Sequence, residues 1–261
     1  MAKQKPKSEL SANESSAAFR ACFDRLSRAE SYATVFSDFI DFTLLMLNFN
    51  KKAEDFKDLE SRWPKVDDQR LFAEMFNHWG NTIGPYEDAL GDLFMECVSH
   101  GRNGQFFTPE PICEMMAMIE FSETTLKPGM RIQDCAAGSG RTLLAAAKVY
   151  RGLEGFNPDQ DLKYYAADND LLCCKMTVIN FIVNTMVGQV WHMNSLSLEH
   201  FRTYHVRKIL TGTHYMPYYF ITGPGTGDWI TMDEAEPIEV NTPILQTPEP
   251  IISKHGQLSF F

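Results

Sequence analysis

The stretch from Arg131 to Val149 constrains the fold more than any other part of this chain. Residues 131–134 are a short extended run, residues 138–140 read Gly-Ser-Gly, and residues 142–149 favour a helix. Glycine in such a turn permits positive φ and lets a ligand approach bare backbone. The N–H groups that begin the next helix then face that ligand. The pattern predicts a strand–turn–helix unit of an α/β protein, and it suits a nucleotide or nucleoside cofactor at the carboxyl end of a parallel sheet.

A Gly-Ser-Gly turn also suits an ordinary strand–helix connection, and no third glycine follows at the dinucleotide spacing. The neighbouring pattern strengthens the cofactor interpretation. Residues 163–167 predict a second strand that ends at Asp168, where a carboxylate can accept hydrogen bonds from both ribose hydroxyls. The alternative is that Asp168 caps the helix predicted from Leu171 to Val183, although Asp170 is equally available as the cap. A third strand is expected over residues 188–193.

Three motifs in this order resemble a known family. Gly-Gln-Phe-Phe-Thr-Pro occupies 104–109, Asp-Cys-Ala-Ala-Gly-Ser-Gly occupies 134–140, and Ala-Ala-Asp ends at Asp168, with Asn180-Phe181 further on. Together with the segment 88–94 they resemble the N6-adenine DNA methyltransferases of the type I modification-subunit class. The resemblance covers roughly residues 85–195. It implies an α/β, Rossmann-like sheet and binding of S-adenosylmethionine (SAM).

The resemblance also implies roles for particular residues. Thr108 would lie near the methionine carboxylate, Asp134 and the glycine turn near the methionine part, Asp168 at the ribose, and Asn194 near the adenine amino group. Two local alternatives stay open: Thr108 also suits a helix cap, and Asn194 also suits a turn that ends a strand. The expected cofactor-binding set is Phe107, Thr108, Asp134, Ala137, Gly138, Ser139, Gly140, Asp168 and Asn194.

The sequence departs from the family at the catalytic motif Asn/Asp-Pro-Pro-Tyr/Phe. That motif supplies oxygen acceptors for the adenine N6 hydrogens and an aromatic ring for the flipped base. Two stretches compete for its place: Tyr215-Met216-Pro217-Tyr218, which is preferred, and Gly223-Pro224-Gly225-Thr226. Both lack the acceptor side chain, so Tyr215, Pro217 and Tyr218 are expected to form a degenerate catalytic motif.

The expected organisation has four parts. Residues 1–16 are polar and predict a disordered tail. Residues 17–100 carry aromatic residues at helical spacing, which predicts a bundle with a packed core rather than a base-stacking surface. Residues 101–230 form the SAM-binding domain, whose sheet is expected to be incomplete because the family fold needs about three further strands. Residues 231–261, acidic and proline-containing, predict a flexible tail.

Composition limits the partners. The net charge of −10 argues against broad nucleic-acid affinity, and the best local basic cluster is Arg202, His205, Arg207 and Lys208, which also suits a solvated surface. The resemblance implies DNA as a partner, together with a specificity subunit or second chain. No apolar run is long enough for a bilayer and no signal peptide or metal-ligand spacing is present, so a cytoplasmic protein with reduced cysteines and no metal is expected.

The last residues, Gln257-Leu258-Ser259-Phe260-Phe261, resemble the peptide by which bacterial replication proteins bind the sliding clamp. A glutamine and an aromatic pair at a chain end can fill a preformed apolar pocket. The alternative is an apolar anchor that folds onto its own domain. For the whole chain two functions stay open: a SAM-dependent DNA adenine-N6 methyltransferase, or a SAM-binding but inactive regulatory or interaction subunit.

Overall fold

Five strands form one mixed sheet in the order β1-β2-β3-β4-β5. β1 pairs with β2 and β2 with β3 in parallel, whereas β3–β4 and β4–β5 are antiparallel. The three parallel strands confirm the strands expected from the sequence and the α/β class. The strand bounds are β1 Arg131–Asp134, β2 Lys163–Asp168, β3 Gly188–Asn194, β4 Glu199–Thr211 and β5 His214–Thr222.

This computed structural model describes residues 11–48, 51–88, 90–96, 106–121, 129–152, 162–211 and 214–224, without the side chains of 210, 211, 214 and 215. Met1–Gly225 forms one compact unit, and a second unit, Thr226–Phe261, lies outside the described residues. The expected flexible tail and the terminal clamp-binding peptide therefore fall outside the described part of the chain.

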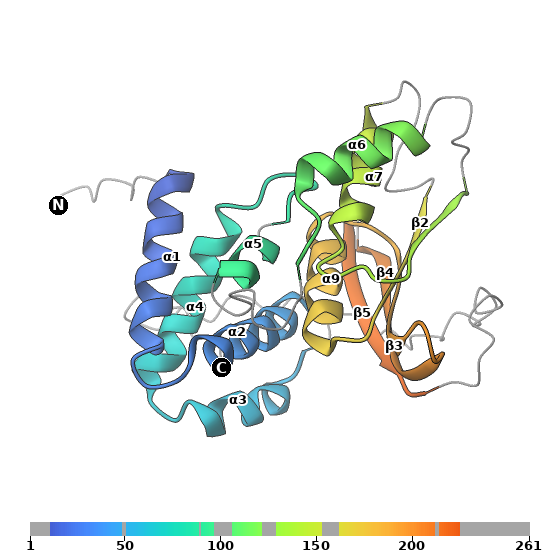
Figure 1. Ribbon diagram of the computed structural model, residues 1–261. Coiled ribbons are helices and arrows are strands. Elements are labelled where there is room, and N and C mark those ends of the chain that lie inside the picture. The colour runs from blue at the N-terminus through green and yellow to red at the C-terminus, as the bar shows by residue number, and fades with distance from the viewer. Residues whose placement is uncertain are drawn as a thin grey trace. The chain divides into compact units, whose positions relative to one another are not determined.

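Three helices accompany the parallel strands: α6 (Glu110–Glu120), α7 (Arg141–Arg151) and α9 (Leu171–Val183). α7 and α9 are the crossovers that parallel strands require. α7 packs on β1, α9 packs on β2 and β3, and α6 packs on α7. Figure 1 shows α9 between the strands and the N-terminal helices. The bounds of α9 are those predicted from its apolar run.

Strand β4 was not predicted, because its charged residues resembled a surface segment. Alternation along the strand sends His205 and Arg207 to one face and Lys208 to the other. His205 is buried, and Arg207 donates to the carbonyl oxygen of Gly188 at 3.0 Å. The expected basic cluster is therefore divided between two faces and forms no continuous surface for phosphate.

The N-terminal region is helical, as predicted, but it begins earlier. Ser11 and Glu14 form a capping box at the start of α1, so residues 12–16 belong to a helix and not to a disordered tail. The elements are α1 (Ala12–Leu26), α2 (Tyr32–Leu47), the 3₁₀ helix η1 (Ala53–Phe56), α3 (Lys57–Arg62), α4 (Val66–Gly80) and α5 (Gly91–Phe94).

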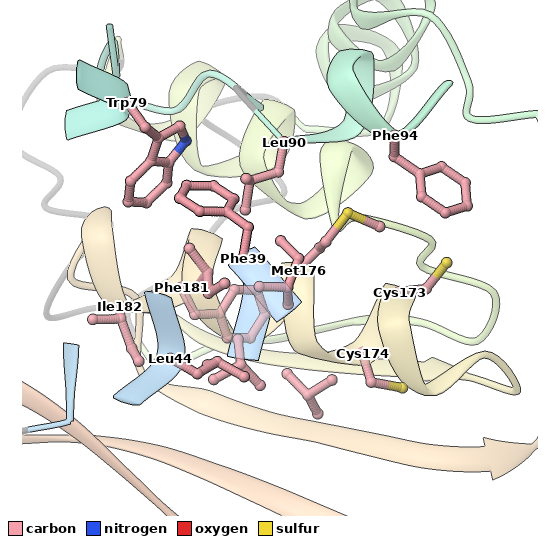
Figure 2. Packing of buried hydrophobic residues seen from close by; sticks show 14 of the residues in the cluster. Phe39, Leu44, Trp79, Leu90, Phe94, Cys173, Cys174, Met176, Phe181 and Ile182 are labelled. Carbon is pink, nitrogen blue, oxygen red and sulfur yellow. The ribbon is translucent and has the colours of Figure 1, made fainter. Parts of the chain in front are cut away.

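One hydrophobic core joins these helices to the sheet. α2 packs on α9, and Phe39 of α2 is fully buried. Figure 2 shows Phe39 between Trp79 of α4 on one side and Met176 and Phe181 of α9 on the other. The described residues of the regions 17–100 and 101–230, which the sequence suggested as separate parts, thus share a core within the unit Met1–Gly225.

Within the region 17–100, which was expected to be helical, residues 86–88 and residue 90 lie outside any helix. Tyr86 has φ +60, and its N–H donates to the side chain of Asn184 at 2.7 Å. That bond, to a residue at the end of α9, replaces a helical one. A single short turn of helix, α5, follows.

Burial of His205 predicts a stability change with pH. The ring stacks on Phe220, with centroids 4.6 Å apart, and burial lowers its pKa to about 4, against an ordinary value of about 6.5. Between these values the unfolded chain binds the proton and the folded chain does not, so stability falls as the pH drops from about 6.5 to 4. The variant His205→Gln should lack this dependence, which amounts to roughly 3 kcal/mol at most. Urea unfolding of both proteins at pH 7 and pH 4.5 measures the loss of stability between the two pH values. If the wild type and His205→Gln lost the same free energy of unfolding, His205 would not be the source of the pH dependence.

Candidate cofactor site

The carboxyl ends of the three parallel strands lie at one edge of the sheet. Asp134 ends β1, Asp168 ends β2 and Asn194 ends β3, so their common edge follows from the parallel register. The loops after β1 and β3 also meet, because the hydroxyl of Ser195 donates to the carbonyl oxygen of Cys135 at 2.6 Å. Ser195 was missed from the sequence, where only its position after a strand-ending asparagine marks it.

The turn after β1 has the predicted left-handed glycines. Gly138 has φ +57 and Gly140 has φ +90. The N–H of Gly138 donates to Oδ2 of Asp168 at 2.8 Å, and the N–H of Ala137 donates to the carbonyl oxygen of Ala167 at 3.0 Å. The turn is thus bound directly to the end of β2, and the acid expected at the ribose lies beside the glycine bend.

Asp168 does not cap α9. Asp170 is the N-cap, and its carboxylate accepts from the N–H groups of Leu172 and Cys173. Asp168 instead accepts from Gly138 and Asp170, and burial raises its pKa above the ordinary value despite these two bonds. An ionised carboxylate has about four acceptor positions, so further donors can still bind it.

Asp134 holds the start of α7. Its carboxylate accepts from the Thr142 hydroxyl and, at 2.9 Å, from the N–H of Ala136. The acid therefore fixes both sides of the turn, before and after the glycines. The resemblance assigned Asp134 to the cofactor, and the structure shows that it also shapes the loop.

Phe107 covers the turn from the side of α6. A Cβ atom at position 138 would lie 2.8 Å from the Phe107 ring, so glycine is needed there for close approach as well as for its φ. Phe107 stacks on Phe94 with centroids 5.1 Å apart. Thr108 follows with an exposed side chain. It does not cap α6, because the N-cap is Pro109 without a side-chain hydrogen bond.

A buried cluster behind the turn centres on Asp88, whose side chain has no exposed surface. Its carboxylate accepts from Arg141 Nε at 2.7 Å, from Asn180 Nδ2 at 2.9 Å and from the N–H of Gly91 at 2.9 Å. The Ser139 hydroxyl is a fourth donor. We call Asp88, Gly91, Ser139, Arg141 and Asn180 the Asp88 cluster. Ser139 was expected to touch the cofactor, but its side chain is buried and points to Asp88.

Asn180 and Arg141 connect the Asp88 cluster to the turn. Asn180 Nδ2 also donates to the carbonyl oxygen of Ser139 at 2.8 Å. Arg141 forms a second ion pair, with Asp92, whose side chain is 80% exposed. The sequence pointed to Asn180 and to the 88–94 segment through the resemblance alone, without a physical role for either.

Asn194 is engaged in its own turn. Its side-chain oxygen accepts from the N–H groups of Leu196 and Ser197 at 3.0 and 3.1 Å. The strand-ending turn that the sequence left open is therefore observed. Its amide nitrogen remains at the carboxyl edge, where the resemblance expects a polar group.

The two stretches considered for the catalytic motif lie at opposite ends of the sheet. Pro217 and Tyr218 pair with Lys208 and Arg207, beyond Gly188 at the amino end of β3. The structure thus does not bring Tyr215, Pro217 and Tyr218 to the cofactor edge, because the long β4–β5 hairpin overhangs the other end. Gly223 and Pro224 follow Thr222, whose partner Thr203 pairs with Trp191, so they lie toward the carboxyl edge.

A small cavity of about 10 Å³, room for roughly one water molecule, lies elsewhere, between α6, α7 and the segment 86–88. Asp134, Gly138 and Asp168 are absent from its walls. Its lining residues are Tyr86, Asp88, Glu110, Cys113, Glu114, Arg141, Leu144 and Ala145. The acidic side chains in this lining would repel the carboxylate of the methionine part of SAM.

Across the described residues, no group of three or more His, Cys, Asp or Glu side chains is placed to hold a metal. No helix in the described ranges is long and apolar enough to cross a membrane.

Gly140 offers a test of the turn. A Cβ atom there would lie 3.1 Å from Thr177 Cγ2, and the φ is +90. Gly140→Ala is expected to lower the free energy of unfolding by about 2–3 kcal/mol, through left-handed strain and the contact with α9. Gly129→Ala is the matched control, since its φ is +83 and nothing lies within 4 Å. Its loss should be about 1 kcal/mol. Thermal unfolding measures both, and equal losses would show that contact with Thr177 does not matter.

The family model for N-6 DNA Methylase matches residues 86–231, more than half of the chain. The chain belongs to this family, as its motifs suggested.

No curated protein sequence matches this chain. A class I SAM-dependent methyltransferase structure from Listeria monocytogenes is similar, with 17% identity, a TM-score of 0.47, and coverage of 70% of this chain and 55% of that one. A type I restriction-modification methyltransferase subunit from Streptococcus thermophilus has 14% identity, a TM-score of 0.37, and coverage of 67% and 57%. This chain thus spans little more than half the length of either structure.

Proposed function

We propose that this chain binds SAM at the carboxyl edge of β1–β3 and acts as a methyltransferase on the N6 amino group of adenine in DNA. The observation that carries the proposal is the hydrogen bond between the Gly138 N–H and Asp168. It joins the two features that a nucleoside cofactor needs at this edge, a left-handed glycine bend and an acid. Membership of the N-6 DNA Methylase family supports the same reaction class.

The residues at this edge suit SAM. Asp168 keeps acceptor capacity for ribose hydroxyls. Both turn hydrogen bonds of the Asn194 side chain use its oxygen, so its amide nitrogen can act as a donor to the cofactor. Thr108 has an exposed hydroxyl beside the covering ring of Phe107, where it can donate to a carboxylate. Backbone N–H groups at the start of α7 favour negative charge nearby. SAM, when bound, supplies an electrophilic methyl group.

The adenine side of the site is less complete. Adenine N6 needs acceptors for its hydrogens before it becomes nucleophilic, and family members use an Asn or Asp side chain for this. Tyr215, Pro217 and Tyr218 lie at the other end of the sheet, while Gly223-Pro224 offers only backbone carbonyls. We infer that a partner supplies the missing acceptor and the DNA contacts, as expected for a chain with a net charge of −10.

The alternative function is a SAM-binding subunit without methyl-transfer activity. The position of Pro217 and Tyr218 at the amino end of β3 favours it specifically. Transfer of labelled methyl groups to adenine-containing duplex DNA, with the chain alone and with lysate from its source added, separates the two. Incorporation in either arm supports the enzyme. No incorporation in both arms, with SAM binding intact, supports the inactive subunit.

SAM binding itself is tested by calorimetry. Asp168→Asn is expected to weaken binding at least about tenfold, because one charged acceptor for the ribose is lost. Asp170→Ser is the matched control: it removes a neighbouring carboxylate but keeps a good helix cap, so its affinity should stay near that of the wild type. Gly138→Trp should abolish binding by filling the turn. No heat of binding in the folded wild type would overturn the proposal in both of its forms.

Sliding-clamp binding is a separate proposal that rests on Gln257, Leu258, Phe260 and Phe261. Removing residues 257–261 should abolish binding to a bacterial clamp and leave SAM affinity unchanged. Equal clamp binding by the full and shortened chains would contradict it.

A further inference from the structure

Helix α6 carries an unusual exposed apolar surface. Half of the large apolar side chains that are exposed in the described residues fall between positions 106 and 119. Four of them, at positions 112, 115, 116 and 119, follow the i, i+3, i+4, i+7 spacing that places side chains on one helix face. We call Ile112, Met115, Met116 and Ile119 the α6 stripe; they are 43%, 51%, 51% and 76% exposed.

The α6 stripe faces away from the rest of the unit. α6 packs on α7 through Cys113 and Ala117, which lie near the opposite side of the helix from the stripe. Lys148 of α7 pairs with Glu114 along the same contact. Figure 1 shows α6 at the margin of the described part, with α7 beside it. A contiguous apolar surface of this kind, rich in methionine, is typical of binding sites.

The order of residues in the stripe indicates what covers it. The four side chains read Ile-Met-Met-Ile with spacings of three, one and three, which is the same in both directions. A twofold axis between positions 115 and 116 of two antiparallel helices would place Ile112 against Ile119 of the other copy, and Met115 against Met116. An isologous interface requires such a self-complementary surface. A stripe without charged residues also lets two copies meet without like-charge repulsion.

We propose that two copies of this chain associate through antiparallel packing of their α6 stripes. The α6 stripe contains none of the residues assigned to the cofactor, and the proposal does not depend on methyl transfer. Two helices alone bury less than the roughly 800 Å² per partner of a standard interface. A reversible dimer at micromolar concentrations is therefore expected.

Analytical ultracentrifugation of the full chain tests the proposal. The wild type should change from monomer to dimer as its concentration rises through the micromolar range. Ile119→Glu and Ile112→Lys should each raise the dissociation constant at least about tenfold, because a charge is buried against an apolar residue. Val66→Glu, which changes an exposed apolar residue on α4, is the control and should dimerise as the wild type does.

A mixing experiment tests the antiparallel arrangement. When the Ile112→Lys and Ile119→Glu chains are combined, the lysine of one faces the glutamate of the other, and the second contact keeps both isoleucines. The mixture should therefore form a heterodimer at concentrations where each variant alone is monomeric. A parallel pairing would place position 112 against position 112 and give no rescue. A monomeric wild type at all concentrations, dimers unaffected by both substitutions, or no rescue on mixing would overturn the proposal.

Discussion

Replacing Asp88 by asparagine should lower the free energy of unfolding by about 3–5 kcal/mol, the usual cost of breaking a buried ion pair from one side. The carboxylate has no exposed surface and accepts from Arg141, Ser139, Asn180 and Gly91. An asparagine amide brings two donor hydrogens into a site that already supplies only donors. Urea unfolding measures the loss.

Asp92→Asn is the matched control for this prediction. Asp92 pairs with the same guanidinium as Asp88, but its side chain is 80% exposed. Exposed ion pairs contribute about 0–1 kcal/mol, so this variant should stay close to the wild type. Losses of similar size in the two variants would show that burial does not govern the Asp88 cluster. Because Ser139 and Asn180 hold the turn, Asp88→Asn should also weaken SAM binding, whereas Asp92→Asn should not.

The second large effect concerns Phe39, at the centre of the shared core. Phe39→Ala should cost about 3–5 kcal/mol through the lost burial and the cavity that remains. The ring packs edge-on against Phe19 and Trp79, with centroid distances of 5.2 and 6.3 Å. Phe39→Leu is the control and should cost about 1 kcal/mol, since it keeps most of the volume.

Phe39→Ala also tests whether the helical and α/β regions unfold together. Fluorine NMR of the fluorotryptophan-labelled protein follows Trp79 in α4 and Trp191 in β3 separately. A common core predicts that both signals shift to the same lower urea midpoint. If only the Trp79 signal moved, the two regions would be independent domains and the shared core would be energetically unimportant.

Local pattern was sufficient for the parallel part of the fold. The extended run 131–134, the Gly-Ser-Gly turn and the apolar run Leu171–Val183 predicted β1, the left-handed turn and α9, because each depends on backbone conformation and nearby periodicity. The family followed from three motifs at fixed spacing, and the family model confirms it. Because β1 and β2 are parallel, Asp134 and Asp168 at their carboxyl ends lie at one edge of the sheet.

Contacts between residues far apart in the sequence could not be predicted from local patterns. Strand β4 was not predicted, because its charged residues obscured the alternation of buried and exposed side chains. The burial of His205 depends on the pairing of β4 with β5, which brings Phe220 against its ring. The helical pattern after Tyr86 was overridden by a bond to Asn184, and the hairpin carried Pro217 away from the cofactor edge.

What the sequence determined by itself is a strand, a glycine bend, an acid at the end of the next strand and the family to which they belong. Only the tertiary structure decided which donors bind Asp88; they are Gly91, Ser139, Arg141 and Asn180. It also decided that Asp168 accepts a hydrogen bond from Gly138 in the glycine bend. The reason is that a buried carboxylate is stable only where donors converge from several elements, and that convergence is not visible in any local pattern.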